Sequence, residues 1–212
     1  MKGDIVGQYF ENENLVSNIK EIETSIYGVK FKFKTDNGVF SKSKLDFGTR
    51  VLLESIPIKE LHGDVLDLGC GYGVVSVILS KLTDCNFDAV DVNKRALHLL
   101  DMNIKLNHVS NITKYESYCY DGLDKNKLYD YIITNPPIRA GKEVVYKMLR
   151  EAKDHLKPDG ILYFVINKDQ GAKSAIKDID DLYETSVIAK EKGFYIIKCF
   201  SRWHIESFML II

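Results

Sequence analysis

From about residue 64 onward, short apolar runs alternate with longer amphipathic stretches. The apolar runs predict strands at 64–68, 86–92, 111–117, 129–135, 160–167, 184–190 and 193–200. The amphipathic stretches, in which apolar residues recur every three or four positions, predict helices at 74–82, 95–107, 143–157 and 170–182. Strands that alternate with helices indicate an α/β fold with a mainly parallel sheet and helices on its faces. Between the last two strands, Lys192-Gly193 predicts a tight antiparallel turn.

The chain before residue 46 has a different pattern. Residues 25–41 read as a β-hairpin, with Asn37-Gly38 as the turn signal. Within it, residues 29–34 (VKFKFK) alternate apolar side chains with lysines. This lysine face is either a solvated strand surface or a basic rim for a phosphate backbone, and the sequence leaves both interpretations open.

A helix is expected next, over residues 45–56 (LDFGTRVLLESI). Asp46 or Thr49 would cap its amino end. We therefore predict two parts: an N-terminal β extension at 1–45 and the main domain at 46–212.

Composition excludes several classes of protein. The chain has 212 residues, 45% hydrophobic and 28% charged, which suits one α/β domain with a small extension. The net charge of −1 does not favour binding of nucleic acid by bulk charge, so such binding would need a local basic patch. The amino terminus lacks the apolar core of a signal peptide, and no apolar run reaches membrane-spanning length. A cytoplasmic protein without a membrane partner is expected.

Cysteine and histidine positions do not indicate a metal site. The four cysteines show no paired spacing and the five histidines none at ligand spacing, so we expect reduced, buried thiols and no metal. Trp203 is expected in the core, and the apolar tail 208–212 as a packed terminal strand.

A glycine-rich loop follows the first strand of the main domain, in residues 65–73 (VLDLGCGYG). Gly69, Gly71 and Gly73 would let the backbone turn sharply and approach a ligand closely. The spacing is not that of a dinucleotide loop, and Asp67 before it would repel a pyrophosphate. A ligand with a cationic amino-acid end would instead be attracted.

S-adenosylmethionine has such an end, and its ribose carries two free hydroxyls. Asp91, at the end of the next strand and about twenty residues beyond the loop, stands where a carboxylate would accept hydrogen bonds from both. The loop and Asp91 together favour S-adenosylmethionine as the cofactor.

With these residues the chain resembles class I S-adenosylmethionine-dependent methyltransferases, from about residue 40 to residue 200. The resemblance implies a Rossmann-like, doubly wound sheet of seven strands with a reversed last strand, which agrees with the strands predicted above. It also implies that an acid after the third strand lies near the adenine, and Asp121 stands at that position.

Asn135-Pro136-Pro137 ends the fourth strand, as in methyltransferases that modify exocyclic or amide nitrogens. An aryl amine is a weak nucleophile because its lone pair is delocalised into the ring. The Asn135 side-chain oxygen and the Pro136 carbonyl would each accept one amine hydrogen and hold the nitrogen for attack, and the prolines would keep this corner rigid. No strong general base is needed, since the proton can leave after transfer.

The residue after the prolines departs from the common motif. An aromatic side chain usually stands there and stacks on the target base, whereas this chain has Ile138. Base stacking is therefore left to another residue or to the aliphatic face of Ile138.

A longer string, residues 135–142 (NPPIRAGK) with FSKSKLDFGT upstream and KDQGAKS downstream, is similar to single-domain relatives of the RsmC-like ribosomal RNA guanine methyltransferases. This resemblance implies methylation of a guanine exocyclic amine in small-subunit RNA, with RNA or the ribosomal subunit as the partner. Asp46, Gly48, Thr49 and Asn135 would then approach the cofactor. Arg139 and Lys142 would face RNA phosphate, although both also suit a solvated helix start.

Other functions stay open. The acceptor nitrogen could belong to a protein glutamine or a small molecule. The chain could also be a non-catalytic RNA-binding or assembly factor with a methyltransferase fold, which the presence of Asp67, Asp91 and Asn135 argues against. A nicotinamide oxidoreductase is disfavoured by the spacing of the glycine loop.

Overall fold

The central sheet of the computed structural model, which describes residues 15–202, has seven strands. Their order across the sheet is β5 (Ile112–Glu116), β4 (Asn86–Asp91), β3 (Asp64–Leu68), β6 (Tyr129–Thr134), β7 (Leu156–Asn167), β9 (Phe194–Ser201) and β8 (Tyr183–Glu191). The first five are parallel, and β9 runs antiparallel to both of its neighbours. This order confirms the predicted doubly wound α/β fold with a reversed last strand.

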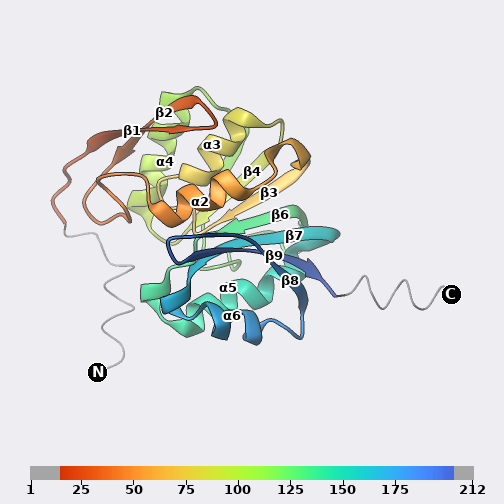
Figure 1. Cartoon of the computed structure of the whole chain (residues 1–212). Helices are drawn as coiled ribbons and strands as arrows, with labels where there is room; N and C mark the ends of the chain where they lie inside the picture. The colour runs from red at the N-terminus through yellow and green to blue at the C-terminus, as the bar shows by residue number, and fades with distance from the viewer. Residues whose placement is uncertain (1–14, 203–212) are drawn as a thin grey trace.

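Helices cover both faces of this sheet (Figure 1). One face carries α2 (Phe47–Ser55), α3 (Val74–Leu82) and α4 (Lys94–Asn107), and the other carries α5 (Lys142–His155) and α6 (Ala172–Asp178). Short 3-10 turns η1 (Ile58–Glu60), η2 (Ile138–Ala140) and η3 (Lys168–Gln170) connect some of these elements. None of the helices between residues 15 and 202 is both long and apolar enough to span a membrane.

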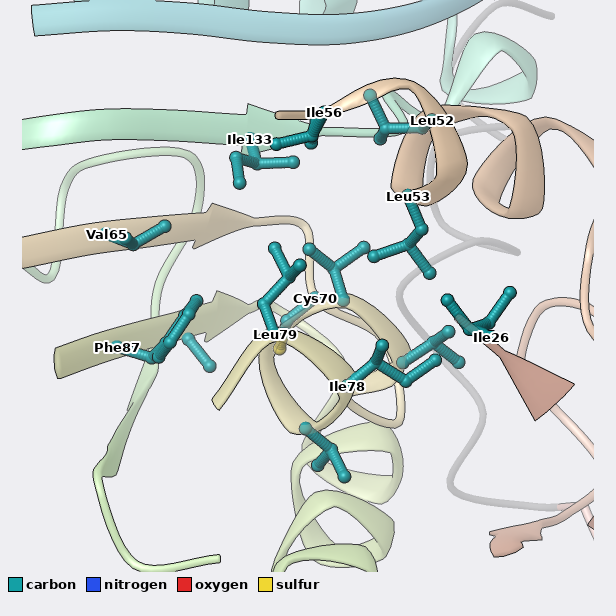
Figure 2. Close-up of a cluster of buried hydrophobic side chains, with 14 of the residues drawn as sticks. Ile26, Leu52, Leu53, Ile56, Val65, Cys70, Ile78, Leu79, Phe87 and Ile133 are labelled. Carbon is teal, nitrogen blue, oxygen red and sulfur yellow. The ribbon is translucent and has the colours of Figure 1, made fainter. Parts of the chain in front are cut away.

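Each face has its own hydrophobic core, because successive residues of a strand point to opposite sides of the sheet. In β3, Val65 packs on the α2–α4 side and Leu66 on the α5–α6 side. Figure 2 shows the first of these clusters, in which Ile26, Leu53 and Phe87 come from three distant segments. The core on this side therefore includes the N-terminal strands.

The N-terminal hairpin exists, but its turn is not where the sequence predicted it. Strands β1 (Lys20–Ile26) and β2 (Val29–Thr35) are joined by Tyr27-Gly28, both with positive φ, of 51° and 77°. This is a two-residue turn of the kind that suits the twist of a hairpin. The Tyr27 hydroxyl donates to the carbonyls of Leu53 and Ile56, 2.9 and 3.1 Å away, and so anchors the turn to the end of α2. Asn37-Gly38 lies beyond β2 in the following loop.

Helix α4 holds the hairpin through two asparagines one turn apart. Asn103 accepts from the Lys34 amide at 2.6 Å and donates to its carbonyl at 3.1 Å. Asn107 forms the same pair of bonds with Lys32, at 3.2 and 2.7 Å. These side-chain amides satisfy backbone groups of β2 as a neighbouring strand would. The hairpin is consequently fixed against the main domain.

Two predicted helix boundaries were wrong. Helix α5 ends at His155, and Leu156 already pairs with Tyr129 as the start of β7; the next pair is Tyr131 with Ile161, so the residues between bulge out. Helix α6 covers only 172–178, because η3 precedes it and turns follow it. The expectations for Trp203 and the tail 208–212 lie outside the described residues.

Candidate active site

A cavity of about 490 Å³ lies beyond the carboxyl ends of β3, β4 and β6. Strands β3 and β6 are neighbours, yet the chain leaves β3 toward α3 on one face and β6 toward α5 on the other. Ligands of doubly wound folds bind at such a switch point. Most of the predicted site residues line this cavity: Asp46, Thr49, Asp67, Gly69, Gly71, Asp91, Asn135, Pro136, Pro137, Ile138 and Arg139.

The glycine loop is tied to the neighbouring strand. The amides of Gly69 and Cys70 both donate to the Val90 carbonyl at 2.9 Å, and the Gly71 amide donates to Asp91 Oδ2 at 2.8 Å. Gly69 and Gly71 have positive φ, of 75° and 55°, which other residues adopt only at a cost. A Cβ built on Gly71 would have no atom within 4 Å, so it would point into open space. Because glycine has no side chain, this part of the loop stays accessible to a ligand.

Gly73 contributes differently from the other two glycines. It does not line the cavity but precedes α3 with φ of 89°. A Cβ built there would lie 2.2 Å from Leu100 Cδ1 on α4. Gly73 is therefore required for the packing of α3 against α4 and supports the loop indirectly.

Asp67 is a buried acid at the end of β3. It is 2% exposed, and Oδ2 accepts from the Ser76 amide at 2.9 Å. Burial raises the pKa of its carboxyl to about 7; the negative charge of Asp91 adds to this, and the hydrogen bonds from Ser76 partly oppose it. A cationic group in the cavity would lower that pKa again, so the chemistry of this acid suits a positively charged ligand.

Asp91 links the glycine loop to the turn after β4. Its two oxygens accept from the amides of Gly71 and Asn93, both at 2.8 Å. Burial raises the pKa of this carboxyl, against the effect of these hydrogen bonds. A carboxylate has about four acceptor positions, so two remain for hydroxyl donors in the cavity.

Three residues from distant parts of the chain meet at the reacting end of the cavity. Asp46 caps α2: its Oδ2 accepts from the Thr49 amide at 2.8 Å and from the Thr49 hydroxyl at 3.2 Å. The Asn135 side-chain amide, which follows β6, donates from Nδ2 to Asp46 Oδ2 at 3.1 Å and to Thr49 Oγ1 at 2.9 Å. Both Nδ2 hydrogens are thus used. Asn135 Oδ1 has no hydrogen-bond partner in residues 15–202 and stays available as an acceptor.

The proline pair forms a rigid corner after Asn135. Both peptide bonds are trans, and Pro136 is buried. The Pro137 carbonyl accepts from the Ala140 amide at 2.9 Å and so begins η2. The Pro136 carbonyl has no donor among the described residues, which leaves a second acceptor beside Asn135.

Not every predicted residue lies at the cavity. Lys142 is exposed at the start of α5, outside the lining. Asp121 also lies outside it, with Oδ1 3.5 Å from the ammonium of Lys147. Residues 117–119, which precede Asp121 by two to four positions, line the cavity instead. The role near the adenine expected of Asp121 stays a prediction.

The loop after the hairpin forms one wall of the cavity, which the sequence did not indicate. Residues 38–41 line it, and two bonds hold them: Asn93 Nδ2 donates to the Gly38 carbonyl at 3.0 Å, and the Tyr72 hydroxyl donates to the Ser41 carbonyl at 3.3 Å. Phe194, at the start of β9, was also missed. Phe40 and Ser41 belong to the string FSKSKLDFGT that carries the resemblance, but no motif predicted that residues 38–41 or Phe194 line the cavity, because only the fold brings them there.

The lysine face of the hairpin is largely compensated by acids. Lys32 pairs with Glu21 and Glu23 at 3.5 and 3.1 Å, and Lys34 pairs with Glu21 at 2.9 Å. Such pairing supports the interpretation of a solvated strand surface over that of a phosphate-binding rim.

No cluster suited to a metal ion occurs within residues 15–202. All four cysteines are buried and unpaired. Burial raises the pKa of the two that line the cavity, well above its usual value for Cys70 and to about 11 for Cys119. Neither thiol is therefore suited to act as a nucleophile at neutral pH.

Most of the chain matches one known protein family. The family model of the methyltransferase small domain matches residues 30–198. The chain belongs to the methyltransferase small domain family. It is an S-adenosylmethionine-dependent methyltransferase. The match starts within β2, and the predicted division between residues 45 and 46 stays a prediction.

Two relatives show how far the similarity extends. The methyltransferase is 41% identical over 192 residues to the uncharacterized protein YbxB of Bacillus subtilis, with 90% of this chain and 96% of that protein covered. It is 33% identical over 172 residues to the ribosomal RNA small subunit methyltransferase C of Shewanella loihica. That match covers 74% of this chain but 48% of the relative, so the methyltransferase spans about half the length of that relative.

A solved structure supports the fold. The 16S rRNA N2 G1207 methyltransferase (RsmC) of T. thermophilus, in complex with AdoMet and guanosine, superposes with a TM-score of 0.76 at 22% identity, covering 89% of this chain and 52% of that one. The ribosomal protein L11 methylase of Lactobacillus delbrueckii subsp. bulgaricus gives a TM-score of 0.65 at 18% identity, covering 77% and 87%. At these identities the likeness concerns the fold alone.

Proposed function

We propose that this methyltransferase transfers a methyl group from S-adenosylmethionine to the exocyclic amine of a guanine in ribosomal RNA. The observation that carries the proposal is the orientation of the Asn135 amide. Because Asp46 and Thr49 occupy both Nδ2 hydrogens, Oδ1 is held as an acceptor next to the free carbonyl of Pro136. Two fixed acceptors match the two hydrogens of an amine group.

The residues of the cavity fit the cofactor. A volume of about 490 Å³ is within the range of small-molecule sites, roughly 300–1,000 Å³. Asp67 would compensate the positive amino-acid end, which in turn would relieve the cost of its own burial. Asp91 would accept the ribose hydroxyls at its two remaining positions, while Asp46 and Thr49 would lie near the methionine end. When bound, the cofactor supplies an electrophilic methyl group.

The chain itself would contribute orientation more than acid–base chemistry. Asn135 Oδ1 and the Pro136 carbonyl would each accept one amine hydrogen, so that the lone pair of the nitrogen points into the cavity. The rigid trans prolines would keep these acceptors in place before the substrate arrives. The amine proton would leave to solvent after the new carbon–nitrogen bond has formed, and no strong base is required.

Charge around the mouth of the cavity supports an RNA substrate. Six exposed cations lie on the loops that border it, and none forms an ion pair within residues 15–202: Lys42, Lys44, Arg139, Lys142, Lys168 and Lys192. They outnumber the exposed acids of these loops, Glu143, Asp169 and Glu191. Phosphate would be attracted here, although the whole chain carries a net charge of −1.

Ribosomal RNA is favoured as the class of substrate by the relatives. The relative from Shewanella loihica, 48% of which is covered by the match, is a small-subunit ribosomal RNA methyltransferase, and the solved neighbour contains guanosine. A guanine amine in a duplex lies in the minor groove, so the base would have to be looped or flipped out. The net charge of the chain is close to zero, which gives little bulk attraction for free RNA. We therefore expect a folded ribosomal subunit in the cytoplasm to present the guanine base.

Labelled S-adenosylmethionine provides the test. The enzyme is incubated with small ribosomal subunits and with naked RNA, and the products are digested to nucleosides and peptides. We expect label in a guanosine methylated on its exocyclic amine, with faster incorporation into subunits. Label in a peptide would replace the proposal by glutamine methylation, and equal rates on both substrates would contradict the role of the particle.

A variant separates catalysis from cofactor binding. Asn135→Ala removes one of the two acceptors, and we expect loss of transfer while calorimetric titration still detects cofactor binding. A variant that transfers methyl groups at the wild-type rate would overturn the role given to Asn135.

A further inference from the structure

The site lacks the aromatic side chain that usually follows the two prolines. Ile138 lines the cavity at that position and offers no π-face to a base. A flipped base nevertheless needs a flat apolar surface beside the two acceptors, because stacking replaces the neighbours that it leaves behind in the RNA.

Phe194 is an aromatic residue of the lining that packs against α2, the helix whose cap, Asp46, bonds to Asn135. It lines the cavity and is partly exposed. A Cβ built on Gly48 would lie 2.8 Å from Phe194 Cε1 and 3.1 Å from Asp46 Oδ2. The same Asp46 oxygen accepts from Asn135 Nδ2 at 3.1 Å. The ring thus lies beside the group of side chains that orients Asn135.

Two of the three other aromatic side chains of the lining belong to a different part of the cavity. Phe40 follows the loop that Asn93 holds beside Asp91, and Tyr118 follows β5. Both are therefore near the end of the cavity at which Asp91 is found. Tyr72, the remaining aromatic of the lining, is 4% exposed, and its hydroxyl donates to the Ser41 carbonyl at 3.3 Å. Phe194 is therefore the lining aromatic at the Asn135 end whose ring is partly exposed.

Gly48 makes the position of Phe194 possible. Glycine inside a helix is destabilising relative to alanine, and Gly48 is buried in the first turn of α2. Any larger residue would collide with the Phe194 ring. The ring also packs against Phe47, with centroids 5.8 Å apart and planes at 55°. One side of Phe194 is supported in this way by α2.

The backbone around Phe194 is rigid as well. The turn Lys192-Gly193 joins β8 to β9 with positive φ at both residues, 45° and 85°, and confirms the predicted tight turn. The Lys168 amide donates to the Gly193 carbonyl at 2.8 Å, and Asn167 of β7 pairs with Phe194. A ring on such a support loses little freedom when a ligand stacks on it.

We propose that Phe194 is the stacking surface for the base of the substrate, in place of the aromatic residue missing at Ile138. The proposal rests on the proposed transfer to a base amine. Phe194 would hold the plane of the base while Asn135 and Pro136 hold its amine. It is therefore a residue that selects planar substrates, and it has no part in binding the cofactor.

Three variants test this on the full chain: Phe194→Leu, Phe194→Tyr and, as a control, Phe47→Leu. Leucine keeps apolar bulk against Gly48 but lacks a π-face, whereas tyrosine keeps both. Phe47 packs on the same ring but does not line the cavity. Each variant is assayed for methyl transfer to ribosomal subunits, for cofactor affinity by calorimetry and for thermal unfolding.

Loss of one base–aromatic stack corresponds to roughly 5- to 150-fold. We expect kcat/KM for the RNA substrate to fall by about that factor in Phe194→Leu, mainly through KM, and to stay within about threefold in the other two. Cofactor affinity should be unchanged in all three. Equal losses in the leucine and tyrosine variants, or none in the leucine variant, would overturn the role of Phe194. Label found in peptide with the wild-type enzyme would overturn the proposed function and, with it, this inference.

Discussion

Replacing Asp67 by asparagine tests the electrostatic account of the cavity. Burial raises the pKa of this carboxyl from 3.8 to about 7 in the protein without ligand. At about 1.4 kcal/mol per pH unit, a shift of about three units makes the ionised side chain cost about 4 kcal/mol relative to an unfolded chain. Asparagine has the same shape and can still accept from the Ser76 amide, but it carries no charge.

The sign of the pH dependence follows from proton binding. Between about pH 4 and pH 7 the folded state keeps a proton that the unfolded chain has released, so the free energy of unfolding of the wild type falls as pH rises through this window. Asp67→Asn removes this contribution. We expect the variant and the wild type to be equally stable near pH 4, and the variant to be more stable at pH 8, by up to about 4 kcal/mol.

Urea denaturation of the cofactor-free proteins at a series of pH values measures this difference. Asp88→Asn serves as the control, because Asp88 is also buried but its Oδ2 is bonded to Lys127 at 2.6 Å and to the Tyr129 hydroxyl at 2.7 Å. Loss of that compensated charge should lower stability. A difference between Asp67→Asn and wild type that does not change with pH, or a variant less stable at pH 8, would refute the reasoning.

The same acid should control binding of the cofactor. Because the ligand needs the ionised carboxylate, we expect wild-type affinity for S-adenosylmethionine to rise with pH up to about 7 and then to level off. The asparagine variant should bind far more weakly and without this dependence. Stability and cofactor binding therefore place opposite demands on Asp67.

Three further comparisons of variants have expected outcomes. Gly73→Ala should lower the free energy of unfolding by about 2–5 kcal/mol, because the residue has a positive φ and its Cβ would collide with Leu100. Gly71→Ala should lower it by only about 1–2 kcal/mol and should mainly weaken cofactor binding. Equal losses of stability in urea denaturation would contradict this. Asn103→Ala should cost about 1–3 kcal/mol and speed amide exchange in β2, and unchanged exchange would count against its role as a strand mimic. Arg139→Ala should raise KM for RNA severalfold and reduce the salt dependence of KM, while Lys32→Ala should change neither. The reverse result would indicate that RNA binds to the hairpin and not beside Arg139.

The alternatives to methyl transfer onto RNA are not equally well supported. The methyltransferase family and the fold make a nicotinamide enzyme untenable. A protein substrate stays testable, because the corner of Asn135 and Pro136 would also hold an amide nitrogen. The exposed cations at the mouth and the position of Phe194 favour a base bound to a phosphate backbone over a peptide.

The sequence alone determined the order of strands and helices in the main domain and the two motifs that flank the cavity. Each of these depends on contacts between residues close in the chain: the period of a strand or helix, the turn of the glycine loop, and the rigidity of Asn135-Pro136-Pro137. Since parallel strands end at one edge of a sheet, Asp67, Asp91 and Asn135 could be expected to meet there. The structure places all three in one cavity.

Only the tertiary structure decided the features that depend on residues far apart. The hairpin turn at Tyr27-Gly28 is anchored by carbonyls of α2, and a tyrosine at that position gives no turn signal by itself. The direction of the Asn135 amide is set by Asp46 and Thr49, more than eighty positions earlier. Phe194 reaches the site because Gly48, on another element, leaves room for its ring. A local pattern encodes the conformation of its own segment, but it does not contain the distances between segments, and those distances make the site.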